Sequence, residues 1–178
     1  MTIICNILHI NLLTFWSSDK PMSKKIKILI GTMTGNAQLV AQELELRFDG
    51  EGIEVETVDM DRLTPEVFES NYIHLICTST YGQGDVPDNA RAFIEAIDES
   101  RPDLRSIRYG VIALGDLTYS ETYCFGGKRF DTLLNECGAV RIGDILLHDA
   151  SSGTMPEEEA ADWSEEWLAS CENIWCQK

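Results

Sequence analysis

The sequence lacks the cysteine and histidine patterns that mark metal sites and disulfide frameworks. Its six cysteines contain no C-x-x-C pair, and its three histidines are scattered, so no metal site is expected. The apolar stretch from Ile10 to Trp16 follows no basic segment, precedes no small-residue cleavage site and is too short to cross a bilayer. These absences favour reduced thiols and a cytoplasmic location.

Basic residues are also scarce. The chain has 14 Lys and Arg against 30 Asp and Glu, which gives a net charge of -16. A surface of this sign argues against binding to nucleic acid or to an anionic membrane. Two interpretations stay open: the charge provides solubility, or it forms a docking face for a basic partner, which electrostatic steering would favour and salt would weaken.

The length indicates one domain. A chain of 178 residues can bury a core of its own, and it shows neither repeats nor low-complexity tracts. Met22 leads through two lysines directly into the first expected strand. We therefore expect the folded domain over residues 22–178, and we interpret residues 1–21 as a disordered or wrongly assigned N-terminal extension.

Apolar runs of strand length alternate with segments of helical periodicity. Strands are expected at residues 26–30, 54–59, 72–77, 111–114 and 140–147. Helices are expected at residues 37–48, 90–97, 125–137 and 157–175, with a weak one at 64–70. This alternation predicts an α/β domain, in which a five-stranded parallel sheet has helices on both faces.

The loop between the first expected strand and the first expected helix contains no basic residue. It reads Gly31-Thr32-Met33-Thr34-Gly35-Asn36-Ala37. The first N–H groups of a helix lack partners, and the helix dipole favours an anion there by about 0.3–2 kcal/mol. The loop therefore predicts a phosphate site, to which threonine hydroxyls add hydrogen bonds, with ordinary helix capping as the alternative.

Two further loops follow expected strands. One covers residues 78–89 and the other residues 115–123, and each carries a tyrosine beside glycines or small polar residues. The carboxyl ends of parallel strands meet at one edge of the sheet, and ligands bind there where the strand order reverses. The three loops together predict a site for a planar ligand with a phosphate tail.

These loops, taken in order, resemble the flavodoxin family. Residues 32–37 are similar to the family's T/S-x-T-G-N/T phosphate loop, residues 79–85 to S/A-T-Y-G-x-G-D, and residues 115–119 to G-D-x-x-Y. The resemblance runs from about Ile26 to Trp167. No long insertion interrupts residues 140–147, so the chain looks like a short-chain form, close to MioC-type proteins and to the FMN domains of diflavin reductases. The resemblance implies a flavodoxin-like sheet with the strand order 2-1-3-4-5.

The resemblance implies FMN as the cofactor and a set of binding residues. Tyr81 and Tyr119 would sandwich the flavin ring, and Asp116 would accept a ring N–H or cap its own turn. Tyr123 would contact the ring or cap the loop. Cys124 would either contact the flavin or lie in the hydrophobic core. The full set is Thr32, Met33, Thr34, Gly35, Asn36, Ala37, Ser79, Thr80, Tyr81, Gly82, Gly84, Leu114, Gly115, Asp116, Tyr119, Tyr123 and Cys124.

The implied function is electron transfer by a flavodoxin. The chain would carry single electrons, as a monomer and not as an enzyme, between a flavodoxin or ferredoxin NADP reductase-type donor and an unidentified acceptor. One alternative is an NAD(P)H-dependent quinone or azo reductase, although no second nucleotide fingerprint is visible. A flavin-free interaction module is another. A phospho-acceptor receiver domain is disfavoured, because Gly31 and Thr78 stand where it needs carboxylates.

Overall fold

The computed structural model describes residues 24–176, and the expectation for residues 1–21 lies outside this range. These residues form six strands and four α-helices, which alternate except that no α-helix separates β2 from β3 or β5 from β6. The strands are β1 (Lys25–Gly31), β2 (Glu54–Asp59), β3 (Ile73–Ser79), β4 (Arg108–Gly115), β5 (Val140–Arg141) and β6 (Leu146–Asp149). The helices are α1 (Asn36–Gly50), α2 (Asp88–Ser100), α3 (Phe125–Glu136) and α4 (Pro156–Trp175).

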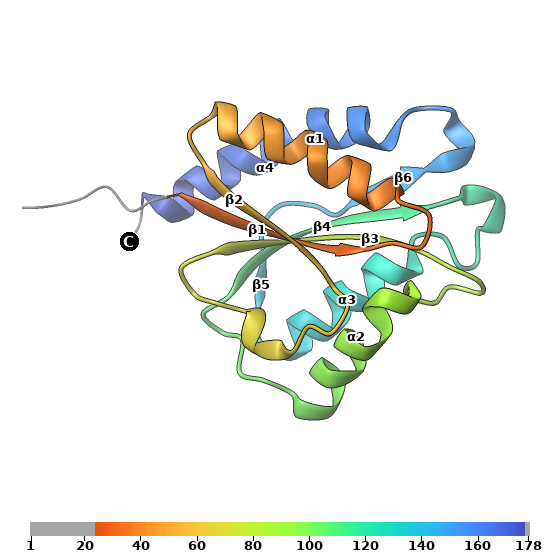
Figure 1. Cartoon of the computed structure of the whole chain (residues 1–178), viewed down its shortest axis with the longest axis horizontal. Coiled ribbons are helices and arrows are strands. Elements are labelled where there is room, and N and C mark those ends of the chain that lie inside the picture. Colours follow the sequence, from red (N-terminus) through yellow and green to blue (C-terminus); the bar gives the residue numbers. More distant parts are fainter. Residues whose placement is uncertain (1–23, 177–178) are drawn as a thin grey trace, which may run out of the picture.

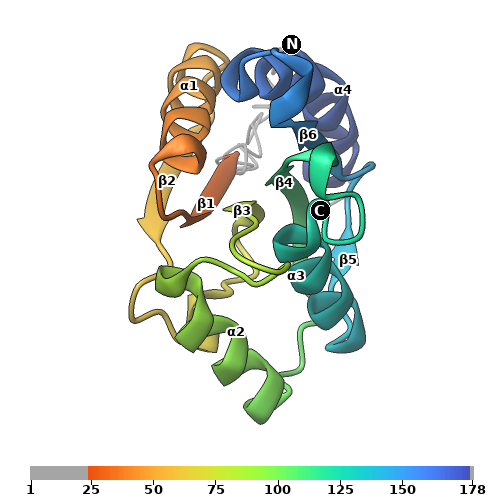
Figure 2. The same ribbon diagram turned by 90° about the vertical axis from the view of Figure 1, so that its right-hand side faces the viewer.

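The strands form one parallel sheet, whose order β2-β1-β3-β4-β5 confirms the predicted 2-1-3-4-5 (Figure 1). Helices α1 and α4 cover one face, and α2 and α3 cover the other (Figure 2). The central strands β1, β3 and β4 are buried along nearly their whole length, which agrees with their continuous apolar runs.

The expected strand at 140–147 is wrong in one respect, because it forms two short strands. Both strands pair with β4. Strand β5 pairs with Arg108 and Tyr109 of β4, and strand β6 pairs with residues 112–115 of β4. Between them Gly143 has φ 65°, a left-handed conformation that no strand continues through. The carbonyl of Asp144 accepts a hydrogen bond from Nε1 of Trp163 at 3.2 Å. The chain is thus diverted from the sheet for a few residues.

Most helix predictions are confirmed. The apolar residues expected to line the first helix, Ala37, Val40, Ala41, Leu44 and Phe48, are its buried residues. The weak helix expected at 64–70 is only a 3₁₀ turn, Pro65–Val67. Gly138 has φ 91° and ends α3 as predicted. Within residues 24–176, no helix combines the length and apolarity that crossing a membrane requires.

Candidate functional site

A pocket of about 570 Å³ lies at the carboxyl edge of the sheet. It brings the three predicted loops together with α1 and with the segment between β6 and α4. The predicted site residues that line it are Met33, Thr34, Asn36, Ser79, Thr80, Tyr81, Gly82, Leu114, Gly115, Asp116 and Tyr119. Among residues 24–176, no lysine or arginine lines this pocket. A phosphate bound by these lining residues would therefore be held by N–H and hydroxyl donors.

The first loop presents an open helix N-terminus. Gly35 is the N-cap residue of α1 with φ 90°, and no side chain caps the helix. The first helical hydrogen bond is donated by the N–H of Leu39 to the carbonyl of Gly35, so the preceding N–H groups of the helix have no intrahelical acceptor. The N–H of Gly35 instead donates to Oγ1 of Thr32 at 2.9 Å, which folds the loop. The arrangement suits an anion.

Asn89, in the first turn of α2, fixes this loop from the opposite side of the sheet. Its Oδ1 accepts from the N–H of Thr32 at 2.9 Å, and its Nδ2 donates to the carbonyl of Ile30 at 3.3 Å. Sequence reasoning missed this residue. A signal was present, because Asn89 follows a strand whose carboxyl end lies beside the first loop.

The second loop is a tight turn that presents a tyrosine. The carbonyl of Tyr81 accepts hydrogen bonds from Gly84 at 3.2 Å and Asp85 at 2.9 Å. Gly82 and Gly84 have φ 55° and 99°, so both need the freedom of glycine. Tyr81 is 50% exposed and Tyr119 of the third loop 68% exposed. Both rings are thus free to contact a planar ligand.

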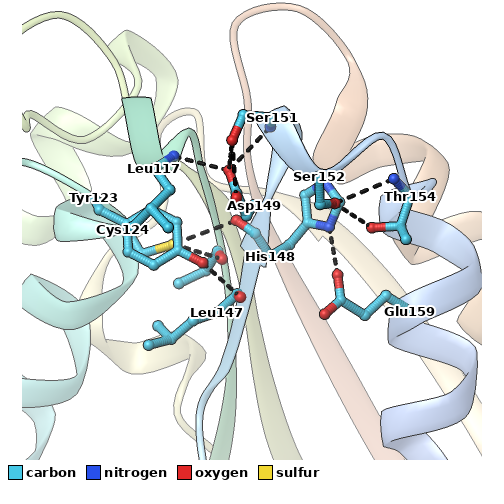
Figure 3. A network of polar contacts seen from close by, with 11 residues as sticks. Leu117, Tyr123, Cys124, Leu147, His148, Asp149, Ser151, Ser152, Thr154 and Glu159 are labelled. Carbon is cyan, nitrogen blue, oxygen red and sulfur yellow. Dashed lines mark hydrogen bonds and ion pairs between the residues drawn. The ribbon is translucent and has the colours of Figure 1, made fainter. Parts of the chain in front are cut away.

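In the third loop, Asp116 caps its own turn. Its Oδ1 accepts from the N–H of Thr118 at 2.8 Å. Oδ1 of Asp149, at the end of β6, accepts from the N–H of Leu117 at 2.8 Å (Figure 3). The hydrogen bond from Leu117, followed by those from Ser151, lowers the pKa of Asp149. The two carboxylates hold the loop that carries Tyr119.

Some predicted residues do not line the pocket: Thr32, Gly35, Ala37, Gly84, Tyr123 and Cys124. Cys124 is fully buried, and its Sγ donates to the carbonyl of Ala113 at 3.2 Å. Burial raises the pKa of this thiol to about 11. The hydroxyl of Tyr123 donates to the carbonyl of Leu147 at 2.8 Å (Figure 3). Both side chains make hydrogen bonds within the fold, which fits the alternatives of core for Cys124 and loop capping for Tyr123, and flavin contact by either stays a prediction.

The segment from β6 to α4 was missed as part of the site. Its lining residues are His148, Ala150, Thr154, Met155, Pro156 and Glu157, and Leu39 and Thr122 complete the pocket. Oε2 of Glu157 is buried without a hydrogen-bond partner among the described residues. Such an atom needs a donor, and a ligand with hydroxyl groups would supply one. Because β6 is parallel to β4, its carboxyl end also reaches the site edge, which was the available signal.

The doubly wound sheet, the open helix N-terminus and the two exposed tyrosines define a protein that binds a planar, phosphorylated cofactor. The sequence profile of the family described as Flavodoxin matches residues 28–163. The chain therefore belongs to the flavodoxin family.

Relatives and solved structures agree. Flavodoxin YqcA of Escherichia coli K12 is 42% identical over 144 residues, which cover 80% of this chain and 95% of that protein. Protein MioC of Escherichia coli K12 is 32% identical over 143 residues, with 80% and 95% coverage. The structure of a mutant of flavodoxin from Pseudomonas aeruginosa superimposes with TM-score 0.68 at 30% identity, and covers 82% of this chain and 97% of that one.

The cofactor of this family is FMN, and the pocket suits it. The uncapped N-terminus of α1 fits the phosphate group. The orphaned oxygen of Glu157 fits a hydroxyl donor such as those of the ribityl chain. The chain is accordingly an FMN-binding electron-transfer protein of the flavodoxin type.

Proposed function

We propose that this chain shuttles single electrons from a reductase to an acceptor enzyme, both of which dock through basic surfaces, and that it does not itself oxidise NAD(P)H. The observation that carries the proposal is the pocket, in which an anion-binding helix end and two exposed tyrosines share one open edge of the sheet. A partner can approach the ring directly at such an edge.

The residues of the three loops divide the work of binding. When bound, FMN supplies the one-electron chemistry. Residues 32–37 would bind the phosphate through N–H groups and hydroxyls, and Tyr81 and Tyr119 would pack on the ring and exclude water. Ser79, Thr80, Gly82, Leu114 and Gly115 would shape the pocket around the ring edge, and Gly84 would set the turn before them. Tyr123 and Cys124 would support the third loop from within the fold.

The second and third loops, here called the rim of the pocket, carry exposed acidic and apolar side chains. Asp85 is exposed on the second loop, and Leu117, Tyr119 and Glu121 are exposed on the third. In a chain of net charge -16, this rim favours a docking partner with a basic face. A flavodoxin or ferredoxin NADP reductase-type donor fits that description. The proposed acceptor is a second protein that also has a basic docking face.

An anaerobic redox titration followed by absorption spectra tests the function. We expect stoichiometric FMN and two separable one-electron steps. Stopped-flow mixing with NADPH alone should leave the protein oxidised until a reductase is added. Direct reduction by NADPH would make the chain a reductase, and a colourless protein that does not take up FMN would make it an interaction module.

The docking surface has a matched test. The double variant Asp85→Asn with Glu121→Gln should slow electron transfer from the reductase and reduce its dependence on salt. The control is Glu43→Gln with Asp49→Asn on α1, where both residues are also exposed and neither lines the pocket. Equal rates for all three proteins would remove the charged rim from the proposal.

We also propose that the protein is a cytoplasmic monomer. The described cysteines Cys77, Cys124, Cys137, Cys171 and Cys176 are free thiols, and all but Cys176 are buried. Free thiols in this number are typical of a reducing compartment. Size-exclusion chromatography with light scattering tests the oligomeric state.

A further inference from the structure

His148 is a buried ionisable residue that lines the cofactor pocket and that no loop motif includes. It is only 3% exposed, on β6 directly beside Leu114 of β4. Its Nδ1 lies 2.6 Å from Oε2 of Glu159 on α4 (Figure 3). An ionised Glu159 accepts the Nδ1–H, so this contact fixes the ring and its tautomer. Nε2 has no protein partner among the described residues.

The charges around His148 are otherwise negative. Glu157 and Glu159 face it from α4, Asp149 follows it on β6, and Asp116 lines the same pocket from the third loop. The thiol of Cys124, before α3, lies 3.6 Å from its carbonyl, and the hydroxyl of Tyr123 bonds the preceding residue. Since neither lysine nor arginine lines the pocket in the described part of the chain, His148 is the described lining residue that can bring a positive charge to it.

The sheet places His148 away from the phosphate loop. Strand β6 pairs with β4, and β4 is separated from β1 by β3. With neighbouring strands about 4.8 Å apart, β6 lies roughly 14 Å from the strand that leads into the phosphate loop. His148 therefore belongs to the half of the pocket that holds Leu114, Gly115 and Tyr119, the half assigned above to the flavin ring.

We propose that His148, oriented by Glu159, binds a proton when the cofactor is fully reduced, and that its cationic ring stabilises the negative charge which the flavin ring then carries. This proposal rests on the assignment of FMN to the pocket. The two electrons come from the donor and two protons come from solvent. One proton goes to the flavin ring, which is left with a single negative charge, and the other goes to His148, which makes and breaks no bond to the cofactor. Reduction thereby becomes more favourable as the pH falls.

The test compares the wild type with His148→Gln and Glu159→Gln. Glu158→Gln is the matched control, because it removes the same charge from the neighbouring, exposed residue of α4. For each protein, the Kd of oxidised FMN and both reduction potentials are measured across the range from about pH 5.5 to 8. The potentials of bound and free FMN then give the Kd of the reduced cofactor.

We expect His148→Gln to weaken binding of reduced FMN about tenfold at the acidic end of the range, and to leave oxidised FMN within about twofold. Its second reduction potential should depend less on pH than that of the wild type. Glu159→Gln should also weaken this pH dependence, because the carboxylate that favours the imidazolium is gone. Glu158→Gln should follow the wild type. Riboflavin in place of FMN should give the same dependence, since the phosphate is not involved.

Parallel pH profiles for wild type and His148→Gln would overturn the proposal. Equal weakening of the oxidised and reduced cofactor would also overturn it, because it would make His148 a purely structural residue. Unfolding in urea at neutral pH shows whether each variant is folded. Absence of FMN binding in the wild type would instead refute the assignment of the pocket, which is a separate result.

Discussion

The Cβ atom that Gly110 lacks would lie 2.5 Å from Nε1 of Trp167. Trp167 projects from α4 onto β4 at this point, and its ring also stacks on Phe48 of α1 with centroids 6.2 Å apart. Its Nε1 is buried without a hydrogen-bond partner among the described residues. The glycine thus allows the largest core side chain to lie against the sheet and to join both helices of that face.

Gly110→Ala should therefore lower the free energy of unfolding by about 1–3 kcal/mol, because the added methyl group overpacks a site that is already full. Gly50→Ala is the matched control. A Cβ at Gly50, near the end of α1, would meet nothing within 4 Å, and its φ is not positive. Urea unfolding followed by tryptophan fluorescence measures both. Equal free energies of unfolding for the two variants would show that Trp167 moves to accommodate the added methyl group without loss of stability.

The phosphate loop predicts a difference between two ligands. The double variant Thr34→Ala with Gly35→Ala removes a hydroxyl and strains a residue whose φ is 90°. FMN affinity should fall by about 1–3 kcal/mol for each lost donor, while riboflavin affinity changes little. Gly52→Ala, also at positive φ with open space around it, controls for backbone strain. Equal losses for FMN and riboflavin would refute the loop's assignment.

The two exposed tyrosines predict a change in both affinity and potential. Tyr81→Ala and Tyr119→Ala should each weaken FMN binding and make full reduction easier, because water then reaches the ring. Fluorescence quenching of added FMN measures the Kd, and a redox titration measures the potentials. Leu46→Ala, at another strongly exposed apolar residue, should change neither. If both tyrosine variants behave like Leu46→Ala, the ring does not lie between these side chains.

Gly82 predicts a shift of the first reduction potential. By family resemblance, we expect its carbonyl to accept a hydrogen bond from the ring after one electron and a proton are added, once the peptide has turned over. Gly82 has φ 55° in a turn closed between Tyr81 and Gly84. Alanine here should penalise the backbone conformation that makes this hydrogen bond by about 1 kcal/mol relative to the conformation of the oxidised state. That cost lowers the first potential by about 40 mV, at about 59 mV per tenfold change. An unchanged first potential would leave Gly82 a turn residue only.

His74 predicts how stability depends on pH. Burial lowers its pKa from 6.5 to about 4. In the unfolded chain it is protonated below about pH 6.5, whereas in the fold it stays neutral until about pH 4. The free energy of unfolding should therefore fall as the pH drops through this window, by about 3 kcal/mol in all.

The measurement for His74 is urea unfolding of the wild type and His74→Leu between about pH 7 and 5, where most carboxylates stay ionised. The variant should lose the slope that the wild type shows. Parallel slopes would mean that His74 is hydrated and titrates normally in the folded protein.

The fold was predictable where local and tertiary signals agree. The apolar run from Ile28 to Ile30 predicts a buried strand, and the helical repeat from Ala37 to Phe48 predicts an amphipathic helix. Both elements are present in the structure. The split of the last strand was not predictable from apolar content. It depends on the backbone of Gly143 and on the contact between Trp163 and Asp144, which lie 19 residues apart.

The site was predictable where a loop directly follows a strand with its ligating groups in sequence. Asn89, which holds the first loop, escaped prediction, as did His148 and Glu157, which line the pocket. Each takes its place through tertiary structure, and no short motif marks it. Cys124 shows the reverse case. It lies next to a loop motif, yet its φ of 58° turns its side chain into the core.

The break between β5 and β6 divides this edge of the sheet into two strands that pair with β4 independently. Each half of the interrupted strand holds its own register on β4, one at Arg108 and the other at Ile112. Additional residues placed at Gly143 and Asp144 would leave both pairings intact, and the entropic cost of a longer loop grows only slowly with its length. This edge therefore provides a place where a peptide tag or reporter can be grafted without altering the strand that delivers His148 to the pocket.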